Sequence, residues 1–283
     1  MAPALVLLLG LFAVPMVHYL WLSTQAQSVL TGLAPKPVGA LQWLRLWNDG
    51  RFWQDAWQTL RFSCVSVALE MGLGLAMALV LHQPLRGRSA LRTLSLLPWA
   101  LPTTVMALGW RWIFNDPFGP INRLLASLGL ASVGFLSDPR FTWMAAVWAD
   151  TWKTTPFVAL LLLAGLQAIP TDLDEAAVLE GARPWQILRH ITLPLLTPYL
   201  LIALVFRLAQ AMGVFDLIQV LTNGGPAGST ESLAVYAYLN AMRFLDFGYS
   251  ATLVFASFLI VLVFCGGAAI AWRYRPAIGS ELP

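Results

Sequence analysis

The sequence contains few charged residues, and this scarcity excludes the soluble classes of protein. Asp, Glu, Lys and Arg make up 11% of the 283 residues, whereas soluble domains carry roughly 25%. Hydrophobic residues supply 58% of the chain, and its mean hydropathy is +0.70. So few charges could hardly form the polar shell that a soluble domain needs. The chain is therefore predicted to be an integral membrane protein.

Lysine, histidine and cysteine are also rare, and each shortage excludes a kind of site. The lysines are Lys36 and Lys153, and neither stands in the G-x4-G-K-[ST] pattern with which a P-loop holds nucleotide phosphates. The three histidines show no ligand or triad spacing. Cys64 and Cys265 lie far apart in apolar runs and predict buried thiols, not a metal site or a disulfide. We expect no catalytic residue, cofactor or metal in this chain.

The net charge of +3 is small and spread out, which argues against a nucleic-acid partner. Six apolar segments are each long enough for a transmembrane helix, which needs about 20 residues. They lie near residues 3–22, 57–82, 93–114, 142–169, 196–220 and 249–272. The first lacks the basic start and the cleavage site of a signal peptide, so we keep it as a helix. The predicted fold is all-α and polytopic, with residues 1–283 forming a single membrane domain.

Arginines in short loops predict the orientation, because cytoplasmic loops are enriched in Lys and Arg. The turn after the second segment is the clearest of these loops. The arginines assigned to the cytoplasmic side are Arg86, Arg88, Arg92, Arg183, Arg189, Arg273 and Arg275. An even number of spans then places both termini in the cytoplasm.

Residues 172–194 form a charged segment between the fourth and fifth apolar stretches. Thr171 followed by Asp174 resembles a capping box, which predicts a helix beginning there. Gly181 ends this helix, and Pro184 suits the first turn of a second one. Such a hairpin could rest in the lipid interface. Its acidic residues favour a protein partner instead, because the cytoplasmic leaflet is negative.

A motif in this segment carries a resemblance to a known family. The spacing E-A-A-x3-G-x9-I-x-L-P is matched without a gap by Glu175, Ala176, Ala177, Gly181, Ile191, Leu193 and Pro194. The chain resembles the inner-membrane permease subunits of ABC importers, and over residues 45–272 it is most similar to the carbohydrate branch. The resemblance implies the type I ABC importer permease fold, with the segment as a coupling helix that docks into a separate ATPase subunit. Its contact residues would be Asp174, Glu175, Ala176, Ala177 and Gly181.

The same resemblance implies a complete set of partners. A second permease subunit would form the other half of the pore, so that the pore is a heterodimer. Two ATP-binding subunits would hold ATP and Mg, and a solute-binding protein would lie on the extracytoplasmic side. The substrate would be a sugar, glycoside or polyol, and the location the bacterial inner (plasma) membrane. An alternative class is an ion-coupled secondary transporter of a small polar solute, using Glu70, Asp150 or Asp216 inside the membrane.

Candidate substrate contacts lie in the fourth and fifth segments. Asp150, Lys153, Thr154 and Phe157 recur at helical spacing and combine hydroxyl-binding groups with an aromatic ring. Asp150 and Lys153 could instead simply neutralise each other. Similarity to the maltose-type permease implies that the sugar site comprises Asp150, Lys153, Thr154, Phe157, Gln210, Ala211 and Val214. Asparagines of that relative are replaced here at positions 150, 211 and 214, so we expect a substrate other than maltose.

Three further features predict details of packing. Pro98 and Pro102 should kink the third span. The small residues Gly72, Gly74 and Ala78 should form a close helix-packing face. Asp216 is expected either to pair with Arg207 or to cap an irregular segment, and Gln210 and Val214 should share a helix face.

Overall fold

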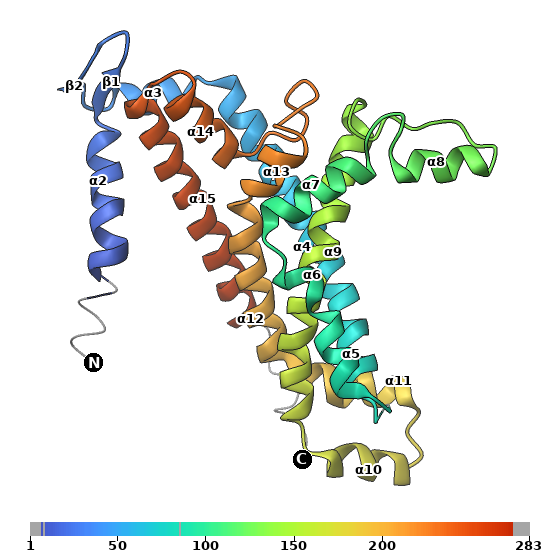
Figure 1. Ribbon diagram of the computed structural model, residues 1–283. Helices are drawn as coiled ribbons and strands as arrows, with labels where there is room; N and C mark the ends of the chain where they lie inside the picture. Colours follow the sequence, from blue (N-terminus) through green and yellow to red (C-terminus); the bar gives the residue numbers. More distant parts are fainter. Residues whose placement is uncertain (1–6, 8, 85, 274–283) are drawn as a thin grey trace.

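A computed structural model describes residue 7 and residues 9–84 and 86–273, and it is an elongated bundle of helices (Figure 1). Its long helices are α4 (Gly50–His82), α9 (Pro139–Gln167), α12 (Leu193–Met212) and α15 (Phe247–Arg273). Many large apolar side chains on these helices are exposed, as expected of a lipid-facing surface. The predicted all-α fold is confirmed.

Three helical stretches among the described residues are long and apolar enough to cross a membrane. They are Gly50–His82, Pro184–Met212 and Phe247–Ile270. A fourth is the pair Pro139–Gln167 and Thr171–Leu179, bent by 71°. These four stretches coincide with four of the six predicted spans. The remaining two are helical but interrupted or short, so the structure is consistent with six spans without fixing that number.

The third predicted span is broken into three helices, α5 (Arg88–Ser95), α6 (Leu97–Ala100) and α7 (Thr103–Ile113). The break lies at Leu101 and Pro102, whose ψ angles of 136° and 133° are extended. Proline has no N–H to continue a helix, and it forces the residue before it out of the helical region. The predicted kink is confirmed at Pro102.

The N-terminal part begins with the π-helical turn η1 (Leu9–Ala13), which runs into α2 (Val14–Leu22). A hairpin of β1 (Gln25–Ser28) and β2 (Gly32–Pro37) follows, with Gln25 opposite Pro37. The short helix α3 (Leu41–Trp47) then leads into α4. In Figure 1 the hairpin lies at the upper end, while α2 stands beside α15.

The upper end of the bundle in Figure 1 also carries α8 (Pro120–Ser127), α13 (Asp216–Leu221) and α14 (Leu233–Met242). The fifth span is shorter than predicted, because α12 ends at Met212 and the chain restarts as α13 at Asp216. Residues 213–215 between them are not helical, so the expectation that Gln210 and Val214 share a helix face is wrong. Gly213 at the end of α12 is a residue with low helix propensity.

The packing of α4 against α9 forms the centre of the bundle. Gly74 is buried there, and a Cβ at this position would lie 2.6 Å from Val158 Cγ1. Ala78 is fully buried nearby, so two members of the predicted small-residue face are confirmed. Gly72 is exposed with nothing near it, because a residue two positions from Gly74 points to another side of the helix.

The two cysteines are less buried than predicted. Cys64 is exposed on α4, and Cys265 is half-buried on α15. An apolar run places side chains toward lipid as well as toward the core, and composition alone does not tell these faces apart.

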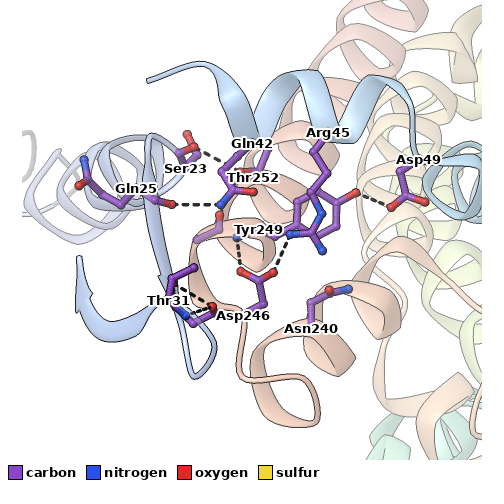
Figure 2. A network of polar contacts seen from close by, with 12 residues as sticks. Ser23, Gln25, Thr31, Gln42, Arg45, Asp49, Asn240, Asp246, Tyr249 and Thr252 are labelled. Carbon is purple, nitrogen blue, oxygen red and sulfur yellow. Dashed lines mark hydrogen bonds and ion pairs between the residues drawn. The ribbon is translucent and has the colours of Figure 1, made fainter. Parts of the chain in front are cut away.

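A polar network ties the elements of the upper end together (Figure 2). Asp49 caps α4 by accepting the Arg51 N–H at 2.9 Å, and it also accepts the hydroxyl groups of Tyr236, at 2.7 Å, and of Tyr249. Arg45 Nη1 contacts Asp246 Oδ2 at 2.6 Å. Burial opposes the ionised form of Asp49, but these hydrogen bonds outweigh it and lower the pKa of the carboxyl below 3.8. Burial and the bond to Asp49 raise the pKa of Tyr236 to about 12.

Candidate functional site

A cavity of about 290 Å³ lies between the broken third span, α9, α12 and the start of α13. Its walls combine charged, hydroxyl, amide and aromatic side chains. The lining residues are Trp99, Thr103, Asp150, Lys153, Thr154, Arg207, Gln210, Gly213, Val214, Phe215, Asp216 and Leu217. Their mixture of polar groups around a hollow is typical of a site for a polar solute.

Five of the seven predicted substrate contacts line this cavity: Asp150, Lys153, Thr154, Gln210 and Val214. The other two predicted contacts, Phe157 and Ala211, are not among its lining residues. Phe157 packs between Trp99 and Phe206, with ring centroids 5.4 Å and 5.1 Å away. Ala211 is buried among other side chains at 3% exposure.

Buried charges from three helices meet at one edge of the cavity. Arg207 on α12 donates from Nε to Glu70 Oε2 at 2.6 Å and from Nη2 to Glu70 Oε1 at 3.0 Å. The same Nη2 contacts Asp150 Oδ2 on α9 at 3.3 Å. Glu70 and Arg207 are 0% and 2% exposed. A two-pronged arginine–carboxylate pair is the geometry in which buried charges are best compensated.

Two uncharged side chains complete this charge cluster, which we define as Glu70, Asp150 and Arg207. Thr154 Oγ1 lies 2.6 Å from both Glu70 Oε1 and the Asp150 carbonyl oxygen, and its single hydroxyl hydrogen is shared between these two acceptors. Gln210 Oε1 accepts from Arg207 Nη1 at 2.7 Å. The polar wall of the cavity is therefore held in place before any solute arrives.

Lys153 does not form a salt bridge with Asp150 in the described part of the chain, so the i, i+3 pairing is replaced by another arrangement. Its Nζ donates to the carbonyl oxygens of Trp99, at 3.2 Å, and of Leu101, at 2.7 Å. These carbonyls border the break before Pro102, where regular helical partners are lost. Lys153 thus stabilises the break and brings its charge to the cavity wall.

Several residues of this site were not identified as contacts from the sequence. Trp99 and Thr103 line the cavity because the break turns the third span toward it. Glu70 and Arg207 were recognised as intramembrane charges, but their pairing across 137 positions was not predicted. Asp216 was expected either to pair with Arg207 or to cap an irregular segment. It is exposed as the first residue of α13, and Arg207 pairs with Glu70 and Asp150 instead. The signal that could have linked Glu70 to Arg207 is the high cost of a lone charge inside a membrane.

The opposite end of the molecule carries the predicted hairpin, formed by α10 (Thr171–Leu179) and α11 (Pro184–Ile187) (Figure 1). The N–H groups of Gly181 and Ala182 donate back to the carbonyl oxygens of Val178, at 3.0 Å, and Ala177, at 2.9 Å. This is a Schellman motif, which requires a left-handed residue at the glycine position. Gly181 has φ +85°, so the glycine turn inferred from the sequence is confirmed.

The start of the hairpin differs from the prediction. Pro170 occupies the N-cap of α10, and no side chain caps the helix, so the capping box of Thr171 and Asp174 is not formed. Thr171 is already the first residue of α10 and cannot serve as its cap. Pro184 does stand in the first turn of α11, and Gln186 Oε1 accepts the Arg183 N–H at 2.8 Å. A π-helical turn, η2 (Leu188–Thr192), then leads into α12.

The hairpin presents apolar side chains to its surroundings. Leu179 and Trp185 are 89% and 64% exposed, and Leu173 and Val178 are exposed as well. Apolar groups gathered on a segment that also carries carboxylates are typical of a protein-docking surface.

Comparisons with known proteins agree with this arrangement. Residues 70–275 match the family described as binding-protein-dependent transport system inner membrane component. The trehalose/maltose transport system permease protein MalF of Thermococcus litoralis is 43% identical, over 93% of this chain and 88% of the relative. The sulfoquinovosyl glycerol transport system permease protein SmoG of Agrobacterium fabrum is 34% identical, over 92% of this chain and 84% of the relative.

A solved structure shares the fold. A bacterial ABC transporter involved in the import of the acidic polysaccharide alginate contains a chain that superposes with a TM-score of 0.83. The two sequences are 22% identical, and the superposition covers 96% of this chain and 92% of the other.

Proposed function

The chain belongs to the family of binding-protein-dependent transport system inner membrane components, the permease subunits of ABC importers, and from this premise we propose its substrate, partners and mode of coupling. Its substrate is a sugar, glycoside or polyol, and the cavity beside the charge cluster is where that substrate binds. The observation that carries the proposal is the cavity of about 290 Å³ with donors, acceptors and aromatic rings on its wall. Relatives named for trehalose, maltose and sulfoquinovosyl glycerol support the substrate class.

Sugar recognition follows from the chemistry of the wall. Asp150, Thr154 and Gln210 offer acceptors whose positions are fixed by bonds to Arg207 and Glu70. Lys153 uses two of its three N–H bonds on carbonyl oxygens, which leaves one to donate. Trp99 lines the cavity and is 44% exposed. Charged acceptors beside an exposed ring suit a molecule with many hydroxyl groups and apolar C–H faces.

The hairpin α10–α11 is proposed as the segment that couples this chain to an ATPase. Asp174, Glu175, Ala176, Ala177 and Gly181 form the part that docks into the partner. The supporting observations are its exposed apolar side chains and its position at the end opposite the β-hairpin (Figure 1). Two ATP-binding subunits would supply ATP and Mg and hydrolyse the ATP, while this chain acts as a transport subunit and not as an enzyme.

The complete transporter would contain a second permease subunit and an extracytoplasmic solute-binding protein. The hairpin would then lie in the cytoplasm, and the end that carries α13 and α14 would lie outside. A solved alginate transporter in complex with a pentasaccharide-bound periplasmic protein shares this fold, with a TM-score of 0.81. Both termini would lie on the cytoplasmic side, although the end after residue 273 falls outside the described residues.

The alternative class, an ion-coupled secondary transporter, is disfavoured by the contacts of the intramembrane carboxylates. Such a protein needs an intramembrane carboxyl group that is free to exchange its ion. Glu70 and Asp150 are instead engaged by Arg207. The fold neighbours are ABC importers as well.

The test is uptake into proteoliposomes that contain this chain, its second permease subunit and the ATPase subunits. A labelled disaccharide should accumulate only when the binding protein is outside and ATP is on the ATPase side. A proton or sodium gradient imposed without ATP should give no accumulation. Uptake that follows the ion gradient and ignores ATP would refute the proposal and favour a secondary transporter.

A further inference from the structure

The carboxylates at the cavity wall and in the charge cluster outnumber the cations, and this balance has consequences for selectivity. Arg207 faces the carboxylates of Glu70 and Asp150. Lys153 is the second cation of the wall, and Asp216 adds a further carboxylate at the start of α13. The group thus contains three carboxylates and two cations. The carboxylates are Glu70, Asp150 and Asp216, and the cations are Lys153 and Arg207. If Asp150 carries a proton the sum is zero, so neither state leaves an excess of positive charge.

An anionic substrate would be poorly accommodated in such a site. A carboxylate or sulfonate that leaves water needs a compensating cation, because burying an unpaired charge is costly. The guanidinium of Arg207 already donates hydrogen bonds from Nε to Glu70, from Nη1 to Gln210 and from Nη2 to Asp150. Lys153 is held toward the backbone of the third span. Both cations can still donate to a neutral hydroxyl, which needs a hydrogen bond but no counter-charge.

The fold itself does not impose this choice. The alginate transporter shares the fold and imports an acidic polysaccharide. Discrimination by charge must therefore come from individual side chains and not from the arrangement of the helices.

We propose that the charge balance of Glu70, Asp150, Lys153, Arg207 and Asp216 restricts this cavity to uncharged sugars and excludes their anionic counterparts. Asp216 is the residue that makes the carboxylates outnumber the cations. It is exposed at the cavity wall and belongs to a different element from the charge cluster. The inference rests on the proposed function, since it names the substrate class of the same cavity.

The experiment measures sugar binding to the complete transporter in lipid nanodiscs, with the binding protein omitted so that only the membrane site selects. Saturation-transfer NMR would compare trehalose with its mono-uronic acid derivative. Wild type should give a signal for trehalose and little for the acid. Asp216→Asn and Asp216→Lys should raise the ratio of acid to neutral binding stepwise, by roughly tenfold for each unit of charge changed.

Asp138→Asn is the matched control, because it makes the same change of charge at the N-cap of α9 while asparagine still caps the helix. This control should leave the ratio unchanged. Equal binding of both sugars by wild type, or a ratio that Asp216→Lys does not alter, would overturn the charge inference. Absence of any trehalose signal, together with failed uptake of every neutral sugar, would count against the proposed function instead.

Discussion

Arg207 shows how one side chain can organise the interior of this protein. It binds Glu70 on α4, Asp150 on α9 and Gln210 on its own helix. The bonds to Glu70 and Asp150 are made where water is scarce, so both carboxylates are needed to offset the loss of hydration. Removal of a single partner leaves a charge without compensation.

Glu70→Gln should therefore destabilise the assembled transporter by about 3 kcal/mol or more, since breaking a buried pair on one side costs about 3–5 kcal/mol. Replacing both Glu70 and Arg207 by methionine, together with Asp150→Asn, should recover most of this stability, because no lone charge of the cluster remains. Thermal unfolding of the purified complex in detergent would measure both changes. Cys64→Ser, at an exposed position of the same helix, is the control and should have little effect. A triple variant as unstable as Glu70→Gln would contradict the ion-pair explanation.

Single residues also show where sequence reasoning succeeds. Helical spacing placed Asp150, Lys153 and Thr154 on one face of α9, and all three line the cavity. The contacts of Arg207 and Lys153 could not be predicted in the same way. They depend on which helices become neighbours and on carbonyl groups that are freed by a break in another helix.

Among the elements, the hairpin α10–α11 depends most directly on its local sequence. Its turn is closed by backbone hydrogen bonds that require the left-handed conformation of Gly181. A Cβ at this position would meet nothing within 4 Å. The constraint is therefore conformational and not one of space.

Gly181→Val should weaken the turn by roughly 1–2 kcal/mol, the cost of placing a side chain in the left-handed region, with more expected from the branched Cβ. Transport and co-purification of the ATPase should both fall, while the chain remains in the membrane. Glu175→Lys should have a similar effect by reversing the charge of the docking surface. Gly181→Asn is the matched control and should retain most activity, because asparagine tolerates this conformation. Normal ATPase binding and uptake in both Gly181→Val and Glu175→Lys would refute the coupling role.

Other elements show why boundaries were harder to predict than the helices themselves. The apolar run at 196–220 continues across the end of α12, so its hydrophobicity does not mark the break at residues 213–215. The β-hairpin at Gln25–Pro37 lies between the first two predicted spans, where no regular element was predicted. Its second strand contains two prolines, which are tolerated here because the sheet has only two strands and both are edges.

At the scale of the whole molecule, the network around Asp49 holds the end that carries the β-hairpin together. Asp49 begins α4, while its tyrosine partners belong to α14 and α15 (Figure 2). Because the folded protein lowers the pKa of Asp49 below 3.8, the ionised carboxylate stabilises the fold. This contribution is present above the unfolded value and is lost as the pH falls through the lower, folded value.

Asp49→Asn should therefore lower the melting temperature near neutral pH, and the difference from wild type should shrink below about pH 4. Asparagine still caps α4 but cannot offer a charged acceptor to the two hydroxyl groups. Melting curves of the purified transporter over this pH range would check the prediction. Asp138→Asn makes the same change at another helix cap and serves as the control. A deficit that stays constant at every pH would contradict the charge-based explanation.

The location of the charge cluster has a mechanical consequence. The hairpin α10–α11 joins the lower ends of α9 and α12, and the Asp150–Arg207 contact pins these two helices to each other higher up (Figure 1). Glu70 pins α4 to the same point. The three helices are therefore joined at one point beside the cavity. A displacement of the hairpin should be transmitted along α9 and α12 to this point. Lys153 should pass it on to the wall built on α6 and α7, because it bonds to the carbonyl oxygens of Trp99 and Leu101.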